Sequence, residues 1–305
     1  MRRLVVAGIV ALLVGGGSAG ALRLPGAPRC PVFPASNAWN ERVDSLPVAA
    51  SSAQLIASIG LDTGLHPDFG SGLYDGGTIG IPYDVVSKST PRSKVSFDYA
   101  DESDHVAYPI PRTVHIEDGS DRHAILVDAS ACRLYELFDL HRQSGRWHAG
   151  SGATWSLRSN HLRPAGWTSA DAAGLPIFPG LARWDEVARG VIDHALRFTV
   201  EHTRRAYVYP ARHDASDSND PSLPPMGLRV RLKASVDIAG FPRQAHIVLQ
   251  ALKTYGMILA DNGSPWYVSG APSPHWSNDD LHSLGRLTGA DFEVVDTSSL
   301  RQPGR

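Results

Sequence analysis

The sequence predicts a mainly β protein, an antiparallel β-sandwich or jelly roll with a few short helices. Short runs of apolar and β-branched residues recur along the chain, and turns rich in Gly, Pro, Asn and Asp separate them. Strands and helices do not alternate regularly, which argues against a doubly wound fold. Only a few segments have the apolar spacing of an amphipathic helix. Many strands with few helices are typical of sandwiches and jelly rolls.

Residues 1–21 have the pattern of a signal peptide. Two arginines precede a short apolar run, which closes on Ala19-Gly20-Ala21, the small-x-small pattern that signal peptidase cleaves. The run is shorter than the roughly 20 residues that span a bilayer, so an uncleaved anchor is the less favoured alternative. We therefore expect cleavage near Ala21 and a secreted, extracellular protein.

The chain has two cysteines, Cys30 and Cys132, and both follow the predicted cleavage site. In an oxidising compartment they most simply form one disulfide, which would close a loop of about 100 residues and tie the N-terminus to the core. A nucleophilic cysteine is the disfavoured alternative, because Cys132 lies in the strand-like segment ILVDASACRLYELF.

Residues 22–60 are expected to form an N-terminal arm that ends in a short helix near Ala53–Ile59, and residues 61–305 a single β-rich domain. A hairpin is predicted at Arg122–Asp128 and Arg133–His141, because two apolar runs flank an Asp-Ala-Ser turn. The other predicted strands are Asp84–Ser87, Val95–Tyr99, Trp147–Leu157, Ala195–Val200, Ala206–Tyr209, Leu228–Leu232, Met257–Asp261, Trp266–Gly270 and Phe292–Asp296.

Three later segments are predicted to be helical. Trp184–Arg189 has two acidic residues in its first turn, where their negative charge stabilises the helix by interacting with the positive end of its dipole. Arg243–Tyr255 has a broad apolar face and is followed by Gly256, a typical C-terminal cap. Asp279–Leu287 is the third.

The segment Arg163–Arg183 is dense in Gly and Pro, so it should be a shaped loop. Its apolar residues, among them Trp167 and Phe178, favour an ordered loop over a disordered one. We expect it to form the wall of a functional site, with Asp171 near its centre. The Gly-rich segment Leu61–Tyr83 is a second candidate for a functional loop.

Charge and motifs exclude several classes of function. The net charge is −2 and no charge block occurs, so we expect no nucleic-acid partner. A P-loop, a dinucleotide fingerprint, a G-x-S-x-G elbow and an H-E-x-x-H motif are all missing, so we expect no nucleotide and no cofactor. No histidine and carboxylate spacing fits a zinc or calcium motif, so no metal is expected either.

Carboxylates in loops or at strand ends are the first candidates for chemistry, because glycoside hydrolysis needs only two of them. Asp171 is the first choice, although an Asx-turn or a helix cap would also explain it. Asp261 precedes Asn262-Gly263 and could equally belong to a hairpin turn. The candidates are Asp68, Asp101, Glu102, Asp171, Glu186 and Asp261.

Histidines form a second set of catalytic candidates. His194 and His213 each stand beside an aspartate that could orient the ring or shift its pKa. His66 and His123 also have an aspartate or arginine close by in the sequence. A lyase acting on acidic polysaccharide would need a cation such as Arg212 to neutralise the uronate. A structural role is the alternative for each histidine.

Tryptophans in loops are the third clue. Trp155, Trp167 and Trp184 stand next to small or polar residues more than within apolar runs. Indole rings stack on sugar rings, and they also fill the core at the base of loops. We therefore consider these three residues and Arg212 as candidate substrate-binding residues.

Four motifs resemble those of a family of secreted bacterial proteins that carries no assigned activity. They are GWTSADAAGLPIFPGLARWDEVARGVIDHALRF, YVYPARH, PPMGLRVRLKAS and ALKTYGMILADNGS. The resemblance extends from CPVFPASNAWN to FEVVD, which is nearly the whole mature chain. It implies a sandwich-like character and an action on carbohydrate, and no residue role follows from it.

Three functions remain open, and one of them, a structural envelope protein, requires no pocket; the other two act on or bind a glycan. The first is a secreted glycoside hydrolase or polysaccharide lyase that acts on extracellular polysaccharide, with Asp171, His194, His213 and Asp261 as the candidate catalytic residues. The alternative is a non-catalytic module that binds a glycan or the cell wall. In either case the expected partner is a polysaccharide or cell-wall glycan, and the expected state is a monomer. Two carboxyl groups facing each other across one cleft would favour the hydrolase.

Overall fold

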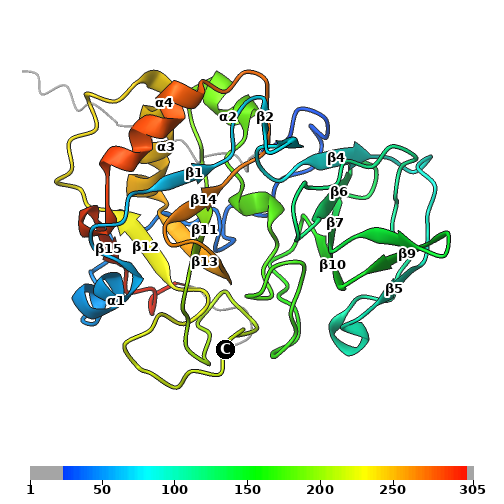
Figure 1. Cartoon of the computed structure of the whole chain (residues 1–305), viewed down its shortest axis with the longest axis horizontal. Helices are drawn as coiled ribbons and strands as arrows, with labels where there is room; N and C mark the ends of the chain where they lie inside the picture. The colour runs from blue at the N-terminus through cyan, green and yellow to red at the C-terminus, as the bar shows by residue number, and fades with distance from the viewer. Residues whose placement is uncertain (1–22, 301–305) are drawn as a thin grey trace, which may run out of the picture.

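The computed structural model describes residues 23–300, so the predicted signal peptide at 1–21 lies outside the described residues. In this range most of the regular structure is β-strand, spread over several sheets and accompanied by a few short helices (Figure 1). The prediction of a mainly β protein is confirmed, whereas the sandwich or jelly-roll arrangement stays a prediction. No helix among residues 23–300 is both long and apolar enough to cross a membrane.

The largest sheet has six strands in the order β1-β14-β11-β13-β12-β15. Their bounds are His66–Asp68 (β1), Leu196–Val200 (β11), Arg229–Leu232 (β12), Met257–Asn262 (β13), Tyr267–Ser269 (β14) and Phe292–Val294 (β15). β1 pairs with β14 in parallel, and so does β11 with β13. The prediction of a purely antiparallel fold was therefore wrong for these pairs. Parallel neighbours need a crossover connection, and residues 201–256 supply it between β11 and β13.

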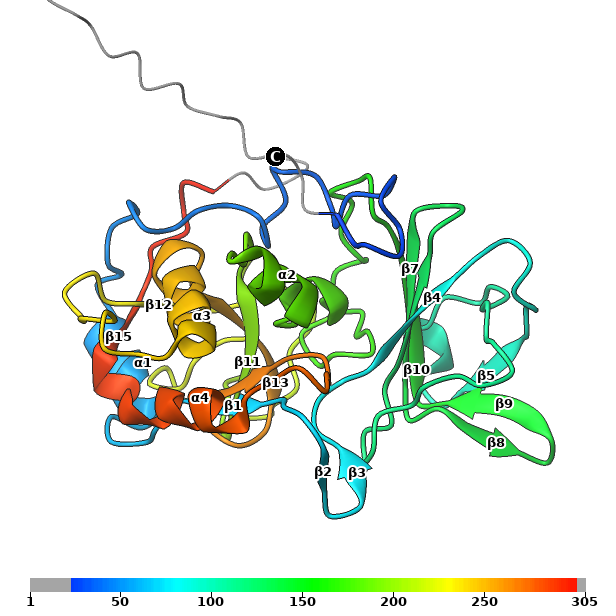
Figure 2. The same cartoon turned by 90° about the horizontal axis from the view of Figure 1, so that it is seen from above.

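A second sheet has four strands in the order β10-β7-β6-β4, and a three-stranded sheet β5-β9-β8 lies beside it. Figure 2 shows these two sheets on one side of the molecule and the six-stranded sheet with its helices on the other. The strands are Tyr83–Val86 (β4), Val95–Phe97 (β5), Ala124–Asp128 (β6), Arg133–Phe138 (β7), His141–Gln143 (β8), Arg146–Ala149 (β9) and Ser151–Ser156 (β10). β6 and β7 form the predicted hairpin. The small hairpin β2 (Leu73–Tyr74) and β3 (Gly77–Thr78) projects between the two sides.

The helices match the sequence-based predictions closely because their signals are local. They are Ser52–Ile59 (α1), Trp184–Arg189 (α2), Arg243–Thr254 (α3) and Asn278–His282 (α4), the last continued by a 3-10 turn at Ser283–Arg286. Glu186 in the first turn of α2 accepts a hydrogen bond from the N–H of Arg183. Gly256 follows α3 with φ +65°, a left-handed conformation that favours glycine.

One predicted strand, Ala206–Tyr209, was wrong. In this segment Tyr207 alone makes an isolated bridge, to Met226. The following Pro210 has no N–H to donate to a neighbouring strand, so pairing cannot extend through it.

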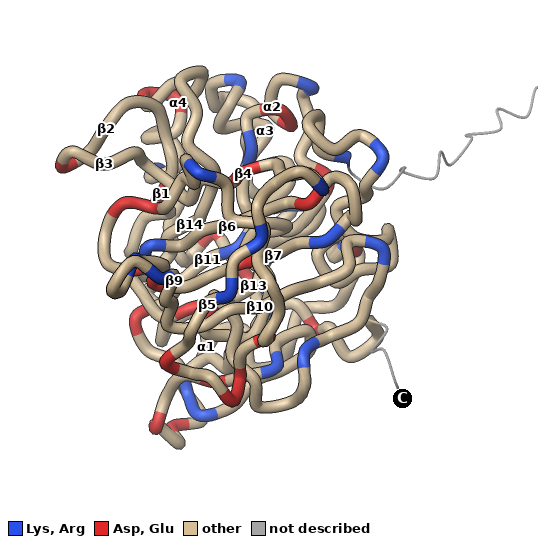
Figure 3. The backbone as a smooth tube through the Cα atoms, turned by 90° about the vertical axis from the view of Figure 1, so that its right-hand side faces the viewer, with Lys and Arg blue, Asp and Glu red and all other residues tan. Residues whose placement is uncertain are grey.

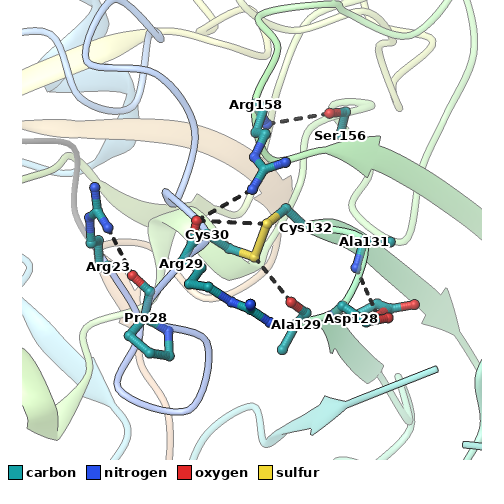
Figure 4. The surroundings of a disulfide bond; sticks show 11 residues. Arg23, Pro28, Arg29, Cys30, Asp128, Ala129, Ala131, Cys132, Ser156 and Arg158 are labelled. Atoms are coloured by element: carbon teal, nitrogen blue, oxygen red, sulfur yellow. Dashed lines mark hydrogen bonds between the residues drawn. A yellow bond between two sulfur atoms is a disulfide. The ribbon is translucent and has the colours of Figure 1, made fainter. Parts of the chain in front are cut away.

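Apolar side chains form separate clusters on the two sides of the molecule. The largest surrounds the six-stranded sheet and includes Trp39 from the N-terminal arm. A second cluster lies on one face of the four-stranded sheet and contains Cys30 and Cys132. These cysteines form the predicted disulfide, 102 residues apart in sequence (Figure 4). The division into an arm at 22–60 and one domain at 61–305 stays a prediction.

The segment Arg163–Arg183 is an ordered loop, as predicted, with one 3-10 turn at Phe178–Gly180 (η2). It leads from β10 to α2 and so connects the two sides of the molecule (Figure 2). The buried Glu136 of β7 accepts the N–H groups of Ile177 and Phe178, each at 2.8 Å. The Glu136 side chain therefore holds this loop against the four-stranded sheet.

Charged residues of both signs are spread along the chain, and several lysines and arginines lie around β5 and β9 (Figure 3). Lys94, Arg142 and Arg146 line a pocket there. The Arg142 guanidinium lies 4.2 Å from the centre of the Trp147 ring. This stacking accounts for the position of one of the three cations.

Candidate functional site

A pocket of about 360 Å³ lies where the two sides of the molecule meet, and we call it the central pocket. Three of the four predicted catalytic residues, Asp171, His213 and Asp261, line it. Its lining residues are Tyr99, Glu102, Asp121, Phe138, Ser151, Thr168, Ser169, Ala170, Asp171, Ala172, His213, Ala215, Asp261 and Asn262. The segment 168–172 belongs to the Gly/Pro-rich loop, so that loop forms one wall of a pocket. That this pocket is a functional site stays a prediction.

The walls of the central pocket come from distant parts of the chain. Asp261 and Asn262 end β13 of the six-stranded sheet. Glu102 belongs to a 3-10 turn, Ala100–Glu102 (η1), which is tied to β10 by a hydrogen bond from the N–H of Asp104 to Gly152. Glu102 in turn accepts the N–H of Thr168 at 2.8 Å. One side of the molecule therefore supplies Asp261 and the other supplies Glu102.

Arg197 on β11 holds the floor of the central pocket together. Its Nε and one Nη donate to the two oxygens of Asp171, each at 2.8 Å, and the same Nη reaches Asp261 Oδ2 at 3.2 Å. Its other Nη donates to the Ser269 hydroxyl at 2.7 Å. Burial alone would lower the pKa of Arg197, but the adjacent carboxylates outweigh burial and raise it. Arg197 is therefore a fixed positive charge.

Strand register explains why these side chains meet. Asp261 is paired with Thr199 across a β-bulge in the β11/β13 ladder, and Thr199 points to the same face of the sheet as Arg197. On the other side of β11, Phe198 pairs with Val268, which places Ser269 beside Arg197. Asp68 on β1 pairs with Ser269. Asp68, Ser269, Arg197 and Asp261 therefore form one polar row across four adjacent strands.

Asp171 and Asp261 share Arg197 but differ in exposure. The Asp171 side chain is 0% exposed, whereas that of Asp261 is 22% exposed. Burial and then the negative charge of Asp171 raise the pKa of Asp261 to about 7, against the opposing effect of Arg197. Asp261 is the member of this pair that can exchange a proton with a ligand near neutral pH.

His213 forms another part of the pocket wall. Its Nδ1 lies 2.8 Å from the carbonyl oxygen of Ala172, which makes Nδ1 the protonated donor. Its Nε2 lies 4.0 Å from Glu102 Oε2. The side chains of His213 and Glu102 are 27% and 35% exposed, so both reach the solvent of the pocket.

Behind the loop wall, His123 forms a buried ion pair with Glu117 through Nδ1. Its Nε2 donates to the carbonyl oxygen of Ala170 at 2.9 Å. Burial by itself lowers the pKa of His123, but the Glu117 carboxylate outweighs burial and raises it to about 9. Both ring nitrogens therefore donate at neutral pH, and His123 fixes the segment that carries Asp171.

The remaining predicted site residues lie outside the central pocket. His194 is fully buried and bonds Glu186 at 2.9 Å and the carbonyl of Ala195 at 2.7 Å. The Arg212 Nε donates to the carbonyl of Arg163 at 2.8 Å. These contacts give both residues positions in the framework of the fold.

The three predicted tryptophans do not line the central pocket either. Trp155 and Trp167 lie near the guanidinium of Arg163, at 5.7 and 5.5 Å from ring centre to guanidinium carbon. Trp155 is only 6% exposed. Trp184 stacks on His275 at 5.3 Å. The aromatic residues of the pocket are instead Tyr99, which is 57% exposed, and Phe138.

Sequence reasoning missed Arg197, Asp121 and Tyr99. A signal existed for Arg197, because a charged residue inside the apolar strand LRFTV is rarely buried without a partner. Glu136 inside RLYELF carries the same signal. Asp121 and Tyr99 lie in exposed loops with no local feature that marks them.

Ser96, His148 and Asp98 also meet, on the outer three-stranded sheet. Ser96 Oγ lies 2.9 Å from His148 Nδ1, and Asp98 Oδ1 lies 3.0 Å from Nε2. Ser96 and His148 are directly paired in the ladder, and Asp98 is two residues further along the chain. Register alone explains this contact, and the Asp98 side chain is 61% exposed. We therefore do not treat it as a catalytic triad.

Within residues 23–300 no group of three or more His, Cys, Asp or Glu side chains could hold a metal ion. Comparison of the chain with protein-family models, with curated proteins and with solved structures gave no match.

Proposed function

We propose that this protein is a secreted glycoside hydrolase that cleaves a neutral extracellular polysaccharide in the central pocket, with Asp261 as the general acid. The observation that carries the proposal is a partly exposed carboxyl whose pKa is raised to about 7, in a pocket that has further carboxylates on its other wall. Glycoside hydrolysis requires one protonated and one ionised carboxyl group. The protein acts as a monomer that needs no cofactor.

In this mechanism the Asp261 carboxyl gives its proton to the glycosidic oxygen as the bond to the anomeric carbon breaks. Glu102 is the second carboxylate, and it receives the proton of the attacking water. His213 accepts a sugar hydroxyl through Nε2, because its Nδ1 already donates to Ala172. Asp171 is a positioning residue, since both its oxygens are bound to Arg197. Burial, together with the negative charge of Asp171, keeps Asp261 protonated near neutral pH.

The charge of the pocket favours a hydrolase over a lyase. The carboxylates of Glu102 and Asp121 line it, and they would repel the carboxylate of a uronate. Of the cations that could neutralise a uronate, Arg197 is already paired with Asp171, and Arg212 does not line the pocket. A neutral glycan meets no such repulsion.

The second candidate function is a non-catalytic glycan-binding module. The exposed ring of Tyr99 beside polar residues favours it, because an aromatic ring and hydrogen-bonding groups suffice for sugar binding. In that case the pocket would bind a glycan and leave its bonds intact.

The experiment that tests the proposal is a screen of the mature protein against neutral and acidic polysaccharides. Reducing ends and the absorbance of unsaturated uronates are followed together. We expect new reducing ends on a neutral glycan without the absorbance, and a loss of at least about 100-fold in rate for Asp261→Asn. Asp62→Asn, at an exposed site outside the pocket, is the matched control and should keep full activity.

Absorbance of unsaturated products would instead identify a lyase. Retention of the protein on a glycan in affinity gels, with no cleavage and no effect of the Asp261 variant on retention, would contradict the hydrolase and favour the binding module.

A further inference from the structure

A second pocket, of about 300 Å³, lies along β1 at the edge of the six-stranded sheet, and we call it the edge pocket. Its walls are His66, Pro67, Asp68, Phe69, Tyr74, Ile79, Tyr267, Asn278, Leu281 and His282. We propose that the edge pocket is an additional subsite that binds neutral sugar units of the same glycan chain as the central pocket. The inference rests on the proposed function and deepens it, because it makes a polymer, cut within its length, the substrate.

The polar row on the sheet joins the floors of the two pockets. Asp261 lies in the central pocket and Asp68 in the edge pocket, with Arg197 and Ser269 between them. The row crosses the adjacent strands β13, β11, β14 and β1. Three spacings of about 4.8 Å between strands separate its ends by roughly 14 Å. That separation exceeds one sugar ring, so a ligand that fills both pockets must be an oligomer.

The β2–β3 hairpin beside the edge pocket also contacts the loop that bounds the central pocket. The N–H and hydroxyl of Thr78, in the β2–β3 hairpin, donate to Asp118 Oδ2 at 2.7 and 3.0 Å. Asp118 belongs to the loop that carries Asp121, a lining residue of the central pocket. At Gly77 an added Cβ would lie 2.4 Å from Asp118 Cβ, so hairpin and loop are in close contact. The hairpin that bears Tyr74 thus stands on the loop that bounds the central pocket (Figure 2).

The chemistry of the edge pocket suits a neutral sugar. The rings of His66 and Tyr267 are stacked, with 4.0 Å between their centres. Tyr74 lines the same pocket and is 80% exposed, so its ring is accessible to a ligand. Sugar rings present an apolar face to aromatic rings and hydroxyl groups to polar side chains such as Asp68. Burial lowers the pKa of His66, which favours its neutral form in the pocket.

The test compares Tyr74→Ala with Leu73→Ala. Leu73 is the matched control, because it is 68% exposed on the same strand and does not line the edge pocket. The probes are cello-, xylo-, manno- and arabino-oligosaccharides from disaccharide to octasaccharide. On the longest chain that is cleaved, we expect Tyr74→Ala to raise KM about tenfold with kcat nearly unchanged. On the shortest cleaved substrate, both variants should match the wild type.

Two results would overturn the inference while the proposed function stands: cleavage with no preference for longer chains, or an equal effect of Tyr74→Ala on short and long chains. Without cleavage, affinity-gel retention on the parent polysaccharides replaces KM. Weaker retention of Tyr74→Ala than of Leu73→Ala would then support the subsite although the hydrolase proposal had failed. Equal retention of both variants, or retention on no glycan at all, would overturn it.

Discussion

At the scale of single residues, the central pocket depends on the different surroundings of Asp171 and Asp261. Both contact one guanidinium, yet Asp171 makes two bonds to Arg197 and Asp261 makes one. The doubly bonded, buried carboxylate is the anion of the pair, and its charge opposes ionisation of the other. Two carboxyls of one residue type thereby take different protonation states.

The raised pKa of Asp261 predicts how the activity depends on pH. Because a general acid must be protonated, kcat/KM of the wild type should fall as pH rises through about 7. In Asp171→Asn the negative charge that raises the pKa of Asp261 is lost. We expect the midpoint of the alkaline limb to move to lower pH by about one unit or more. An unchanged midpoint would show that another group titrates in this limb.

The same pKa shift predicts an effect on stability. The unfolded Asp261 loses its proton near pH 4 and the folded one near 7, so the folded state binds more protons in this window. Stability should therefore fall as pH rises from about 4 to 7. Asp261→Asn should be more stable than the wild type at pH 8, by roughly 1–3 kcal/mol. Urea unfolding of both proteins at pH 4 and pH 8 measures the difference, and equal curves at pH 8 would refute it.

The raised pKa of His123 predicts a pH dependence of the same sign, a loss of stability as pH rises, in a higher pH window. Its pKa is raised to about 9 in the folded state, so its ion pair with Glu117 contributes fully below about pH 6.5 and is lost as pH rises through 9. We expect His123→Gln to lose on the order of 2 kcal/mol at pH 6 and much less at pH 9.5. His161→Gln, at an exposed site, is the control for this unfolding series. A loss independent of pH would indicate a packing effect.

At the scale of elements, the Gly/Pro-rich loop depends on β7. Glu136 accepts the two N–H groups at the start of η2, and burial raises the pKa of this carboxyl to about 8 although the two N–H groups lower it. Glu136→Ala would leave both N–H groups buried without an acceptor. We expect a loss of roughly 2–4 kcal/mol in the free energy of unfolding, and a smaller loss for Glu136→Gln, which keeps one acceptor oxygen. Denaturant unfolding of the three proteins tests the order.

Elements with local signals could be predicted from the sequence. α2 and α3 begin and end within a residue or so of the predicted bounds, because acidic first turns and a capping glycine act within one helical turn. The β6–β7 hairpin follows from its turn in the same way. Pairing between distant strands leaves no such local signal, so the parallel pairs β1/β14, β11/β13, β4/β6 and β5/β9 were missed.

At the scale of the whole molecule, the disulfide links the N-terminal arm to the four-stranded sheet. A cross-link between residues 102 apart in sequence lowers the conformational entropy of the unfolded chain. This loss of entropy stabilises the folded state by up to about 4–5 kcal/mol. We expect the double variant Cys30→Ala/Cys132→Ala to melt roughly 10 °C below the wild type. Calorimetry without reductant tests this, and the double variant in dithiothreitol is the control, since reductant should leave its melting unchanged.

The sequence alone determined the mainly β class, the short helices, the disulfide and the loop at Arg163–Arg183, because turn residues, caps and composition act over a few neighbouring positions. It also singled out Asp171, His213 and Asp261 as candidates. Only the tertiary structure decided that these three line one pocket and that His194 and Trp155 lie in the framework instead. Strand register and a β-bulge place Asp261 beside Arg197. Burial and neighbouring charge then set its pKa, and both depend on residues far apart in the chain.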